Sequence, residues 1–429
     1  MLLSGCSVLV PTGQTTTPTA VAATSSPSVA PSASIAPTPT LTVAADPTPR
    51  SFARVALDGG SHDGTVTADQ RLQLGPSPVK GSYADPHGST IADERGVWTS
   101  ASVRVPFAFH RLVASWNATT PSGTWIDVQM RASGASHATK WYTLAIWSSG
   151  DDTIHRTTLK GQDDADGRVN VDTFETASGE ADFTSYQLRV TLHRTAGLSG
   201  TPSLTLLGAV TSRLAEHAFA TAFSGVARDL DVPTLSQETH TGHYPEYDGG
   251  GEAWCSPTST AMVLAFWKTG PSAADLAAFP GASHADGQVD HAARYTYDWS
   301  YKGAGTWPFN TAYAASYGLE GFVTRLRSLR EAELFIAAGI PLIASINGVL
   351  PGFLFTSTKG HLLVIRGFTA NGDVITNDPA VLADAQARKV YPRLEFESIW
   401  LDSSAGTVYV IHPPGVRLPA NVAGLPANW

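Results

Sequence analysis

The chain has 429 residues, of which 42% are hydrophobic and 15% are charged, and its formal net charge at pH 7 is −9. A chain of this length predicts roughly two to three domains with a sizeable buried core. Lys and Arg never cluster beyond a pair, so nucleic acid is not an expected partner, because phosphate binding needs a basic footprint. No run of about 18 consecutive apolar residues occurs, so the sequence predicts no membrane-spanning helix.

The N-terminal stretch carries one of the two cysteines of the chain, Cys6. The run from Leu3 to Cys6 resembles the lipobox of bacterial lipoproteins, in which the cysteine is lipidated. The charged and apolar regions that normally precede such a site are missing, which favours a translation start further upstream. Residues 7–50 are rich in Thr, Ser, Pro and Ala, so we expect residues 1–50 to form a disordered tether. The alternative is a secreted tail with an unmodified Cys6.

Residues 51–215 have a period-two pattern with no helix of convincing length. Six stretches rich in Val, Ile, Thr and aromatic residues are separated by Gly, Asp, Pro and Ser: 97–106, 110–119, 124–133, 139–148, 184–194 and 203–212. Such spacing predicts an all-β domain, and we expect a jelly-roll-like β-sandwich. Four tryptophans favour core or cross-strand packing, with a sugar-stacking face as the alternative: Trp116, Trp125, Trp141 and Trp147.

The pattern changes from about residue 216. Apolar residues at three- and four-residue spacing predict helices over 259–267, 273–280, 311–318 and 329–339. Short apolar runs predict strands over 341–347, 361–368, 373–379 and 407–413. Helices followed by an antiparallel sheet are typical of an α+β domain, which we expect over 216–429.

Cys255 lies between a glycine-rich segment and an apolar helical pattern. We expect Ser256 as the N-cap and Pro257 as the first helical residue. The thiol then lies beside the positive end of the helix dipole, which favours the thiolate, the reactive form. A buried structural cysteine is the competing interpretation. A disulfide with Cys6 is disfavoured, because the spacing shows no disulfide framework.

A nucleophilic cysteine needs a base, and the sequence offers one downstream. His361 opens a predicted strand and Asp378 follows the next one, which predicts a Cys/His/Asp arrangement with Asp378 orienting the imidazole. Upstream, Gln237 has a side-chain amide that can join the backbone N–H of Cys255 in an oxyanion hole.

The turn between these two strands raises a problem of distance. A strict two-residue turn at Asn371 and Gly372 leaves Asp378 about 13 Å along the strand from His361. A longer loop from Thr369, or a bulge, is therefore expected to bring the acid back.

Several segments resemble the bacteriocin-processing type of papain-fold cysteine peptidases, the C-thirty-nine-like family: 232–237, 249–264, 290–328, 360–368 and 372–380. The resemblance covers residues 229–413 and implies a papain-like fold. It also implies that Gln237 is the oxyanion residue, Cys255 the nucleophile, His361 the base and Asp378 its orienter.

This sequence departs from the processing peptidases in two respects. A long insertion separates Gln237 from Cys255, where those peptidases have a few residues. No G-x-x-x-x-G-K-[ST] motif of an attached ATPase occurs, so cleavage of double-glycine leaders is not implied.

Two segments have features of cation sites. One contains four candidate ligands whose spacing matches no zinc pattern, so a solvated loop leading into a helix is expected: His284, Asp286, Asp290 and His291. The other, residues 162–173, has Thr173 where a calcium loop has a bidentate acid, so a polar hairpin is expected. We therefore expect no metal and no other cofactor.

These observations together predict a monomeric, two-domain cysteine peptidase that hydrolyses peptide or amide bonds through an acyl-enzyme on Cys255. We expect it to be secreted, or anchored through Cys6 to the outer face of the bacterial cell membrane. Three alternatives remain: a peptidoglycan-directed endopeptidase or amidase, a transpeptidase, and a non-catalytic surface protein whose β-domain binds. The intact Gln/Cys/His/Asp set argues against the last.

Overall fold

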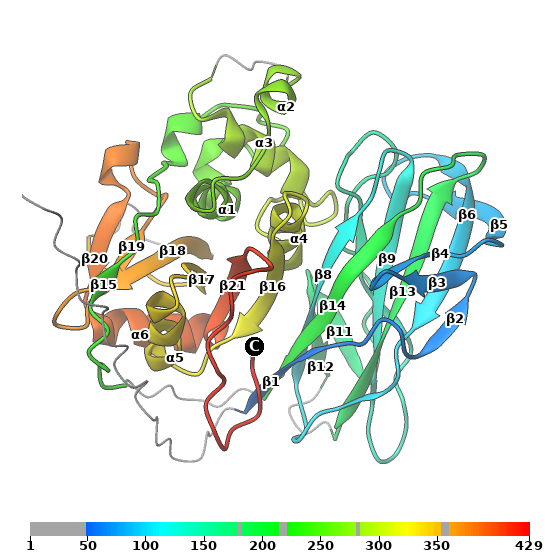
Figure 1. Ribbon diagram of the computed structural model, residues 1–429, viewed down its shortest axis with the longest axis horizontal. Helices are drawn as coiled ribbons and strands as arrows, with labels where there is room; N and C mark the ends of the chain where they lie inside the picture. The colour runs from blue at the N-terminus through cyan, green and yellow to red at the C-terminus, as the bar shows by residue number, and fades with distance from the viewer. Residues whose placement is uncertain (1–48, 178–181, 214–220, 280–283, 353–359) are drawn as a thin grey trace, which may run out of the picture. The chain divides into compact units, whose positions relative to one another are not determined.

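The computed structural model describes residues 49–177, 182–213, 221–279, 284–352 and 360–429, which belong to one compact unit. Cys6 and the predicted tether, apart from its last two residues, lie outside the described residues. Three antiparallel sheets, each of seven strands, organise the described part of the chain (Figure 1). Within it, no helix combines the length and the apolar character needed to cross a membrane.

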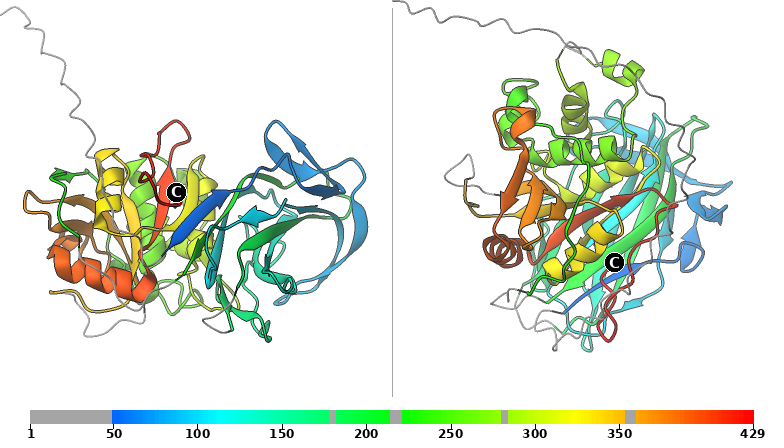
Figure 2. Two further views of the ribbon diagram at one scale, coloured as in Figure 1. Left: turned by 90° about the horizontal axis from the view of Figure 1, so that it is seen from below. Right: turned by 60° about the vertical axis from the view of Figure 1, so that its left-hand side comes forward.

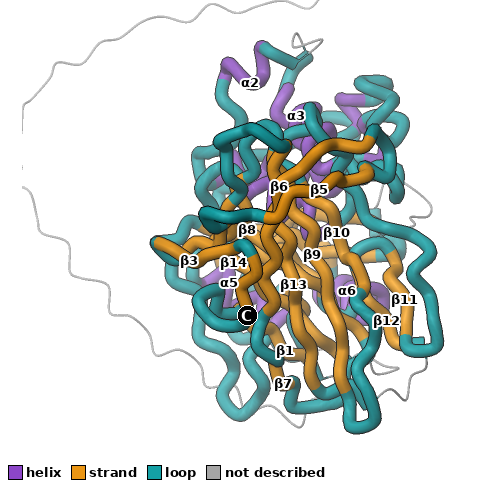
Figure 3. The backbone as a smooth tube through the Cα atoms, turned by 90° about the vertical axis from the view of Figure 1, so that its right-hand side faces the viewer, coloured by secondary structure: helices purple, strands orange, loops and turns teal. Residues whose placement is uncertain are grey.

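The first two sheets lie in the N-terminal part of the described chain. One sheet consists of β1 (Arg50–Arg54), β3 (Thr65–Ala68), β4 (Arg71–Leu74), β8 (Arg111–Thr119), β11 (Gly167–Asn170), β12 (Thr173–Thr176) and β14 (Ser203–Ser212). The other consists of β2 (Ser61–Asp63), β5 (Val79–Ala84), β6 (Thr90–Thr99), β7 (Val103–Arg104), β9 (Thr124–Ser133), β10 (Tyr142–Trp147) and β13 (Ser185–Thr195). Figure 3 shows their long strands β8, β9, β13 and β14 running side by side.

Burial along these strands shows how the two sheets pack. In β13 buried residues alternate with partly exposed ones, as expected for a strand with one covered face. In β8 seven consecutive residues are buried, so both faces of that strand are covered. The predicted β-sandwich is confirmed at this level. Trp116, Trp125 and Trp147 are at most 1% exposed, which supports core packing for these three in place of a sugar-stacking face.

The third sheet lies in the C-terminal part and has the strand order β16-β21-β17-β18-β19-β20, with β15 paired to β18. Its strands are β15 (Arg228–Asp229), β16 (Glu320–Arg325), β17 (Leu342–Ile346), β18 (His361–Phe368), β19 (Val374–Asn377), β20 (Arg388–Tyr391) and β21 (Thr407–His412). The helices are α1 (Cys255–Phe266), α2 (Ala273–Ala277), α3 (Gly287–Thr296), α4 (Trp307–Ala315), α5 (Leu329–Ala337) and α6 (Arg393–Ser404). Short 3-10 turns are η1 (Glu238–His240), η2 (Gly251–Ala253) and η3 (Asp384–Gln386).

The predicted α+β pattern is confirmed. Two of the elements that were not predicted lack a clear periodic pattern in the sequence. Strand β16 and helix α6 were not expected from the sequence. Every residue of β16 after the first is buried, so its hydrophobic pattern has no alternation. Helix α6 has polar and apolar residues mixed around its circumference, so its apolar stripe is weak. In both cases the tertiary environment, rather than periodicity, selects the element.

Strand β16 is also where the sandwich meets the C-terminal part. Asn117 of β8 forms two hydrogen bonds with the backbone of Gly321, through Nδ2 at 2.7 Å and Oδ1 at 3.2 Å. The hydroxyl of Ser115 accepts a hydrogen bond from Val323 N at 2.8 Å. Side chains of one strand thus satisfy the backbone of another, which explains why both faces of β8 are buried.

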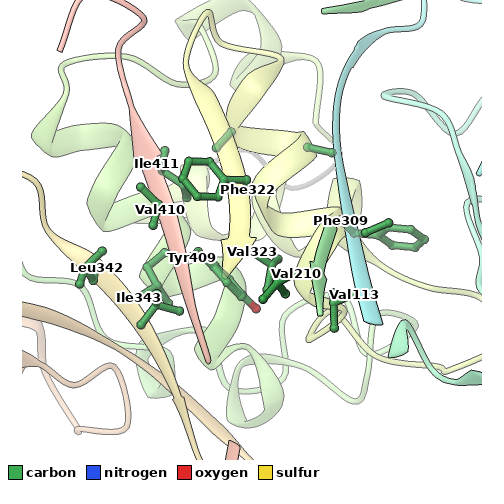
Figure 4. Close-up of a cluster of buried hydrophobic side chains, with 14 of the residues drawn as sticks. Val113, Val210, Phe309, Phe322, Val323, Leu342, Ile343, Tyr409, Val410 and Ile411 are labelled. Carbon is green, nitrogen blue, oxygen red and sulfur yellow. The ribbon is translucent and has the colours of Figure 1, made fainter. Parts of the chain in front are cut away.

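Apolar side chains continue across the same boundary (Figure 4). Val113 and Val210 of the sandwich belong to one buried cluster with Phe322 and Val323 of β16, together with residues of β17 and β21. The chain end contributes as well, because Phe52 N of β1 donates to Ala427 O at 2.8 Å and Asn428 is fully buried. Figure 2 shows β1 beside the C-terminal segment. The sandwich is therefore a packed neighbour of the C-terminal part, within the same compact unit.

Candidate active site

Cys255 is the first residue of α1, and its side chain is partly exposed. The predicted N-cap was wrong by two residues: Trp254 is the N-cap, and Pro257 lies inside the first turn. The hydroxyl of Ser256 is buried and lies 2.9 Å from the hydroxyl of Tyr409. Ser256 therefore contacts a residue that is distant in the sequence and does not cap the helix. The earlier start places Cys255 itself among the first helical residues, whose N–H groups have no acceptor within the helix.

His361 is the first residue of β18 and is 4% exposed. Its Nε2 lies 2.8 Å from Oδ1 of Asp378. Cys255 acts on the same imidazole, since its interaction with the ring is among the causes that raise the pKa of His361. The preceding Gly360 has a φ of 147°, which L side chains rarely adopt, so the chain enters β18 through a glycine-specific conformation. The three predicted residues are thus brought into one chain of contacts.

The distance between the predicted base and acid is resolved by the strand register. Ile365 pairs with Thr376 and Gly367 with Ile375, so Arg366 is an extra residue in β18. The connecting loop spans 369–373 and closes with a hydrogen bond from Thr369 N to Asp373 O at 2.9 Å. Both the bulge and the longer loop expected from the sequence are present. Together they place Asp378 about two residues, roughly 7 Å, along the strand from His361, which side chains can span.

The carboxylate of Asp378 is held from several sides. Tyr391 Oη donates to its Oδ2 at 2.6 Å, and Ala380 N donates to its Oδ1 at 3.0 Å. Burial raises the pKa of Asp378, but His361 and these hydrogen bonds outweigh burial and lower it below the usual value. Tyr391 was not identified from the sequence. It stands thirteen residues away on the neighbouring strand, and no motif marks it.

The pKa of His361 is raised to about 10. Burial is the largest single influence and lowers it, while the charge and hydrogen bond of Asp378 and the contact with Cys255 raise it further than burial lowers it. A raised imidazole pKa keeps the ring protonated at neutral pH. A thiol beside a protonated imidazole and the first turn of a helix is the arrangement expected of a nucleophilic cysteine.

Gln237 precedes η1 and is 2% exposed. Its Nε2 donates to Glu252 O at 2.7 Å and to Glu238 Oε1 at 3.1 Å. Both Nε2 protons of Gln237 are therefore already in hydrogen bonds. The oxyanion of a substrate has to replace the Glu238 carboxylate as the acceptor of one of them. Burial is the main cause that raises the pKa of Glu238. Sequence reasoning did not select Glu238, although its place next to Gln237 was a usable signal.

The insertion between Gln237 and Cys255 folds back against the first of these residues. A Cβ atom on Gly251 would lie 2.3 Å from the carbonyl oxygen of Gln237 and 2.5 Å from the carbonyl carbon of His240. Only glycine permits this close approach of η2 to η1. The end of the long insertion therefore packs against Gln237. The length of the insertion does not prevent Gln237 and Cys255 from lining the same site.

A cavity of about 780 Å³ lies at this site, lined by Gln237, Cys255 and His361 together with other residues of the C-terminal part. The sandwich contributes a further set: Arg111, Asn170, Val171, Asp172, Thr173 and Glu175. Polar and charged groups from both parts of the unit therefore surround the thiol. This second wall was not anticipated from the sequence.

The wall includes the turn of a β-hairpin. Asn170 of β11 pairs with Thr173 of β12, so Val171 and Asp172 form a two-residue turn, and the polar hairpin expected in this region is confirmed. Val171 has a φ of 57°, which is an outlier for a β-branched residue. Asp172 Oδ2 accepts a hydrogen bond from Trp307 N at the start of α4, at 2.8 Å, and burial raises the pKa of Asp172 to about 6. Strain of this kind often accompanies functional sites.

Comparisons with known proteins were made for the whole chain. No curated protein matches it. Three solved structures that match are titled "Structural basis for the promiscuous specificity of the carbohydrate-binding modules from the beta-sandwich super family", "Structure of infectious bursal disease virus Gt strain" and "Xylanase10C (mutant E385A) from Cellvibrio japonicus in complex with xylopentaose".

The sequence identities to these three structures are 8%, 13% and 11%, and the TM-scores are 0.18, 0.19 and 0.20. The matches cover 36%, 40% and 43% of this chain and 55%, 36% and 30% of the matched chains. Similarity this low carries no argument about fold or function.

Family models match both parts of the described chain. Residues 50–212 match the Peptidase C39 N-terminal domain, and residues 229–408 match the Peptidase_C39 like family. The second match contains Gln237, Cys255, His361 and Asp378, and the first contains the strands of the sandwich. The chain therefore belongs to the C39-like cysteine peptidase family.

Proposed function

We propose that the protein is an extracytoplasmic cysteine peptidase that cleaves peptide bonds through a Cys255, His361 and Asp378 triad. The observation that carries the proposal is the line of contacts from a partly exposed thiol through a buried imidazole to a buried carboxylate, at the wall of a cavity. A family match alone is compatible with an inactive member. A thiol beside a base that a carboxylate orients is what nucleophilic catalysis needs.

The proposed reaction begins with attack of the Cys255 thiolate on the carbonyl carbon of the substrate. The oxyanion that forms takes hydrogen bonds from the Cys255 backbone N–H and from Gln237 Nε2, once the Glu238 carboxylate has given up its place. The His361 imidazolium donates its proton to the leaving amine, and the C–N bond breaks to leave a thioester. Neutral His361 then takes a proton from water, which attacks the thioester and releases the acid and the thiol.

The arrangement of elements fits a papain-like fold. Cys255 is the first residue of α1, a helix that is buried on nearly all sides. Ser259 Oγ of this helix donates a hydrogen bond to Leu362 O of β18 at 3.1 Å. The base is the first residue of β18, and the acid directly follows β19, the antiparallel neighbour of β18. A central helix packed against the sheet that carries the base is the architecture that the resemblance implies for papain-fold peptidases.

The substrate is proposed to be a peptide chain, either in a protein or in the stem peptides of peptidoglycan. The cavity is walled by the hairpin turn of the sandwich as well as by the residues around Cys255, so a substrate contacts both. The sandwich therefore has a part in substrate selection. Arg111 and Glu175, which lie 3.1 Å apart, offer charges of both signs for a peptide backbone end or a side chain.

The cellular location is a separate part of the proposal. Lipidation of Cys6 is expected to hold the enzyme on the outer face of the cell membrane through residues 7–48. Mass spectrometry of the native protein should find an N-terminal cysteine with attached acyl chains. An unmodified Cys6 contradicts the anchor and leaves the peptidase proposal unaffected.

The decisive experiment incubates the full chain with a peptide library and, separately, with purified cell walls. Cleavage of either substrate, with a thioester adduct of matching mass at Cys255, supports the proposal. Transfer of the acyl group to an added amine in place of water identifies a transpeptidase.

The control for this experiment is Cys255→Ala, which removes the nucleophile. We expect cleavage and iodoacetamide labelling of the folded protein to fall at least about a thousandfold, with a melting temperature close to that of the wild type. Because the thiol is partly exposed, its removal leaves little cavity. Undiminished cleavage by Cys255→Ala contradicts the proposed function. A large loss of stability in this variant indicates that Cys255 is a structural core residue.

A further inference from the structure

Three histidines converge on one buried carboxylate, apart from the triad. Asp290 lies in the first turn of α3 and is 1% exposed. Its Oδ1 lies 3.0 Å from His240 Nδ1 and 3.2 Å from His243 Nδ1. Its Oδ2 lies 3.5 Å from His284 Nδ1, which makes no hydrogen bond with the described residues. The cluster of His240, His243, His284 and Asp290 is called the His/Asp cluster below.

Only part of this set was visible in the sequence. Asp290 and His284 were among the four cation-ligand candidates, whereas His240 and His243 lie in the insertion after Gln237. The other two candidates face elsewhere. His291 Nδ1 lies 2.9 Å from Tyr313 Oη, and Asp286 accepts a hydrogen bond from Gln288 Nε2 at 3.4 Å. The spacing in the sequence therefore contained only two of the four residues of the cluster.

The histidines of the cluster lie close together and are only partly hydrogen-bonded. The rings of His243 and His284 are stacked with centroids 3.5 Å apart. His240 is 1% exposed and its Nε2 has no hydrogen-bond partner among the described residues.

The Nδ1 atoms and the carboxylate that face one another form a donor set for one divalent cation. Nδ1 ligands of neutral imidazoles and a carboxylate oxygen are the donor set of Zn²⁺ and related transition metals. Bonds of about 2.0–2.1 Å in a tetrahedral site put neighbouring ligand atoms roughly 3.3–3.4 Å apart. The three distances to Asp290 range from 3.0 to 3.5 Å, and the ligand atoms of His240, His243 and Asp290 lie within 4.8 Å of one another.

We propose that the His/Asp cluster is a structural site for one divalent transition-metal ion, with Zn²⁺ as the expected occupant. His240, His243 and Asp290 are the core ligands and His284 the fourth. Burial of His240 and Asp290 leaves little room for a reacting substrate, which favours a structural over a catalytic ion.

The site would fasten the insertion to α3. His240 N donates to the carbonyl oxygen of Gln237 at 3.0 Å, and His243 N donates to that of His240 at 2.9 Å. Metal binding at His240 and His243 therefore holds the turn that follows the proposed oxyanion residue. An ion there fixes the position of Gln237 through this turn and does not contact the substrate.

The test measures metal binding directly, in the full chain carrying Cys255→Ala so that the catalytic thiol cannot bind zinc. The protein is stripped with a chelator, titrated with ZnCl₂ by calorimetry, and analysed for bound zinc by mass spectrometry after dialysis. We expect one zinc per chain. The Co²⁺-loaded protein should show the visible absorption of a four-coordinate cobalt site.

Two ligand variants and one control are compared in the same background. Asp290→Asn and His243→Gln should each lose stoichiometric zinc and the cobalt spectrum. His137→Gln removes an exposed histidine paired with Asp166 in the sandwich and should retain both. Because Asp290 is buried and its variant could fail to fold, the partly exposed His243 provides the second test.

Absence of bound zinc from the stripped and titrated protein overturns the proposal. So does unchanged zinc binding in a folded His243→Gln protein. Since the measurements use a chain without its nucleophile, they are independent of whether the peptidase proposal holds.

Discussion

Two of the buried histidine–aspartate pairs among the described residues, one in each part of the chain, differ in their surroundings. In the sandwich, His193 Nδ1 lies 2.7 Å from Asp93 Oδ2, and its Nε2 lies 3.6 Å from Asp127 Oδ2. In the C-terminal part, His361 Nε2 lies 2.8 Å from Asp378 Oδ1, and the same residue interacts with Cys255 and lines a cavity. Both imidazoles are almost fully buried.

The two pairs have similar electrostatics. Burial lowers the pKa of His193 most strongly, but Asp127 and Asp93 raise it further, as Asp378 does for His361. His193 is also stacked on Trp125 with an interplanar angle of 5°. A raised imidazole pKa therefore does not distinguish a proposed catalytic base from a structural ion pair. The distinction lies in the neighbouring thiol and in access to a cavity.

The largest expected effect is a loss of activity that depends on one of the two histidines only. His361→Gln should lower peptidase activity at least about a thousandfold, because a general base and the partner of the thiolate are lost. Both His361→Gln and His193→Gln should lower the free energy of unfolding by roughly 3–5 kcal/mol, because each removes the imidazole that faces a buried carboxylate, Asp378 or Asp93. Activity assays and denaturant unfolding measure both. If His193→Gln abolished activity in a folded protein, the comparison would be wrong.

The next effect concerns the pH dependence of stability. His361 has a folded-state pKa of about 10, above the value of about 6.5 of an unfolded chain. Its pair with Asp378 therefore contributes stability that is complete below about pH 6.5 and is lost as pH rises to about 10. The unfolding free energy of the wild type should fall more steeply over this range than that of Asp378→Asn. Parallel curves for the two proteins would contradict the raised pKa.

A smaller change is expected in the alkylation rate of Cys255. Because His361 stays protonated at neutral pH, the rate with iodoacetamide should be nearly constant between about pH 6 and pH 8. In His361→Ala the rate should instead rise through about pH 8.5, the titration range of an ordinary thiol. Stopped-time mass spectrometry gives both profiles, and His193→Gln serves as the control with an unchanged profile. Slow labelling that does not depend on His361 supports a buried structural cysteine.

The smallest effect is expected at Tyr391, which touches the acid rather than the base. Tyr391→Phe removes the hydrogen bond from Tyr391 Oη to Asp378 Oδ2 and should raise the pKa of that carboxyl. We expect a loss of stability of about 1 kcal/mol. The acidic limb of the pH–activity profile should move to higher pH. A purely structural tyrosine would change stability and leave this limb in place.

The sequence alone selected Cys255, His361 and Asp378 as candidates and predicted the bulge or long loop that joins the last two. It could do so because each of these residues stands at the start or end of an element, where local patterns and turn residues are informative. The helix, the strands and the sandwich followed from apolar periodicity in the same way. The N-cap at Ser256 failed because the tertiary contact of Ser256 with Tyr409 took precedence over local capping.

Only the tertiary structure decided which distant residues share a site. The hairpin turn at Val171 and Asp172 forms a wall of the cavity because the sandwich packs on β16 through Asn117 and Ser115. His240 and His243 meet Asp290 because the insertion after Gln237 folds back on α3. Neither arrangement leaves a periodic trace in the sequence, since the partners are separated by tens of residues and come together only through the packing of whole elements.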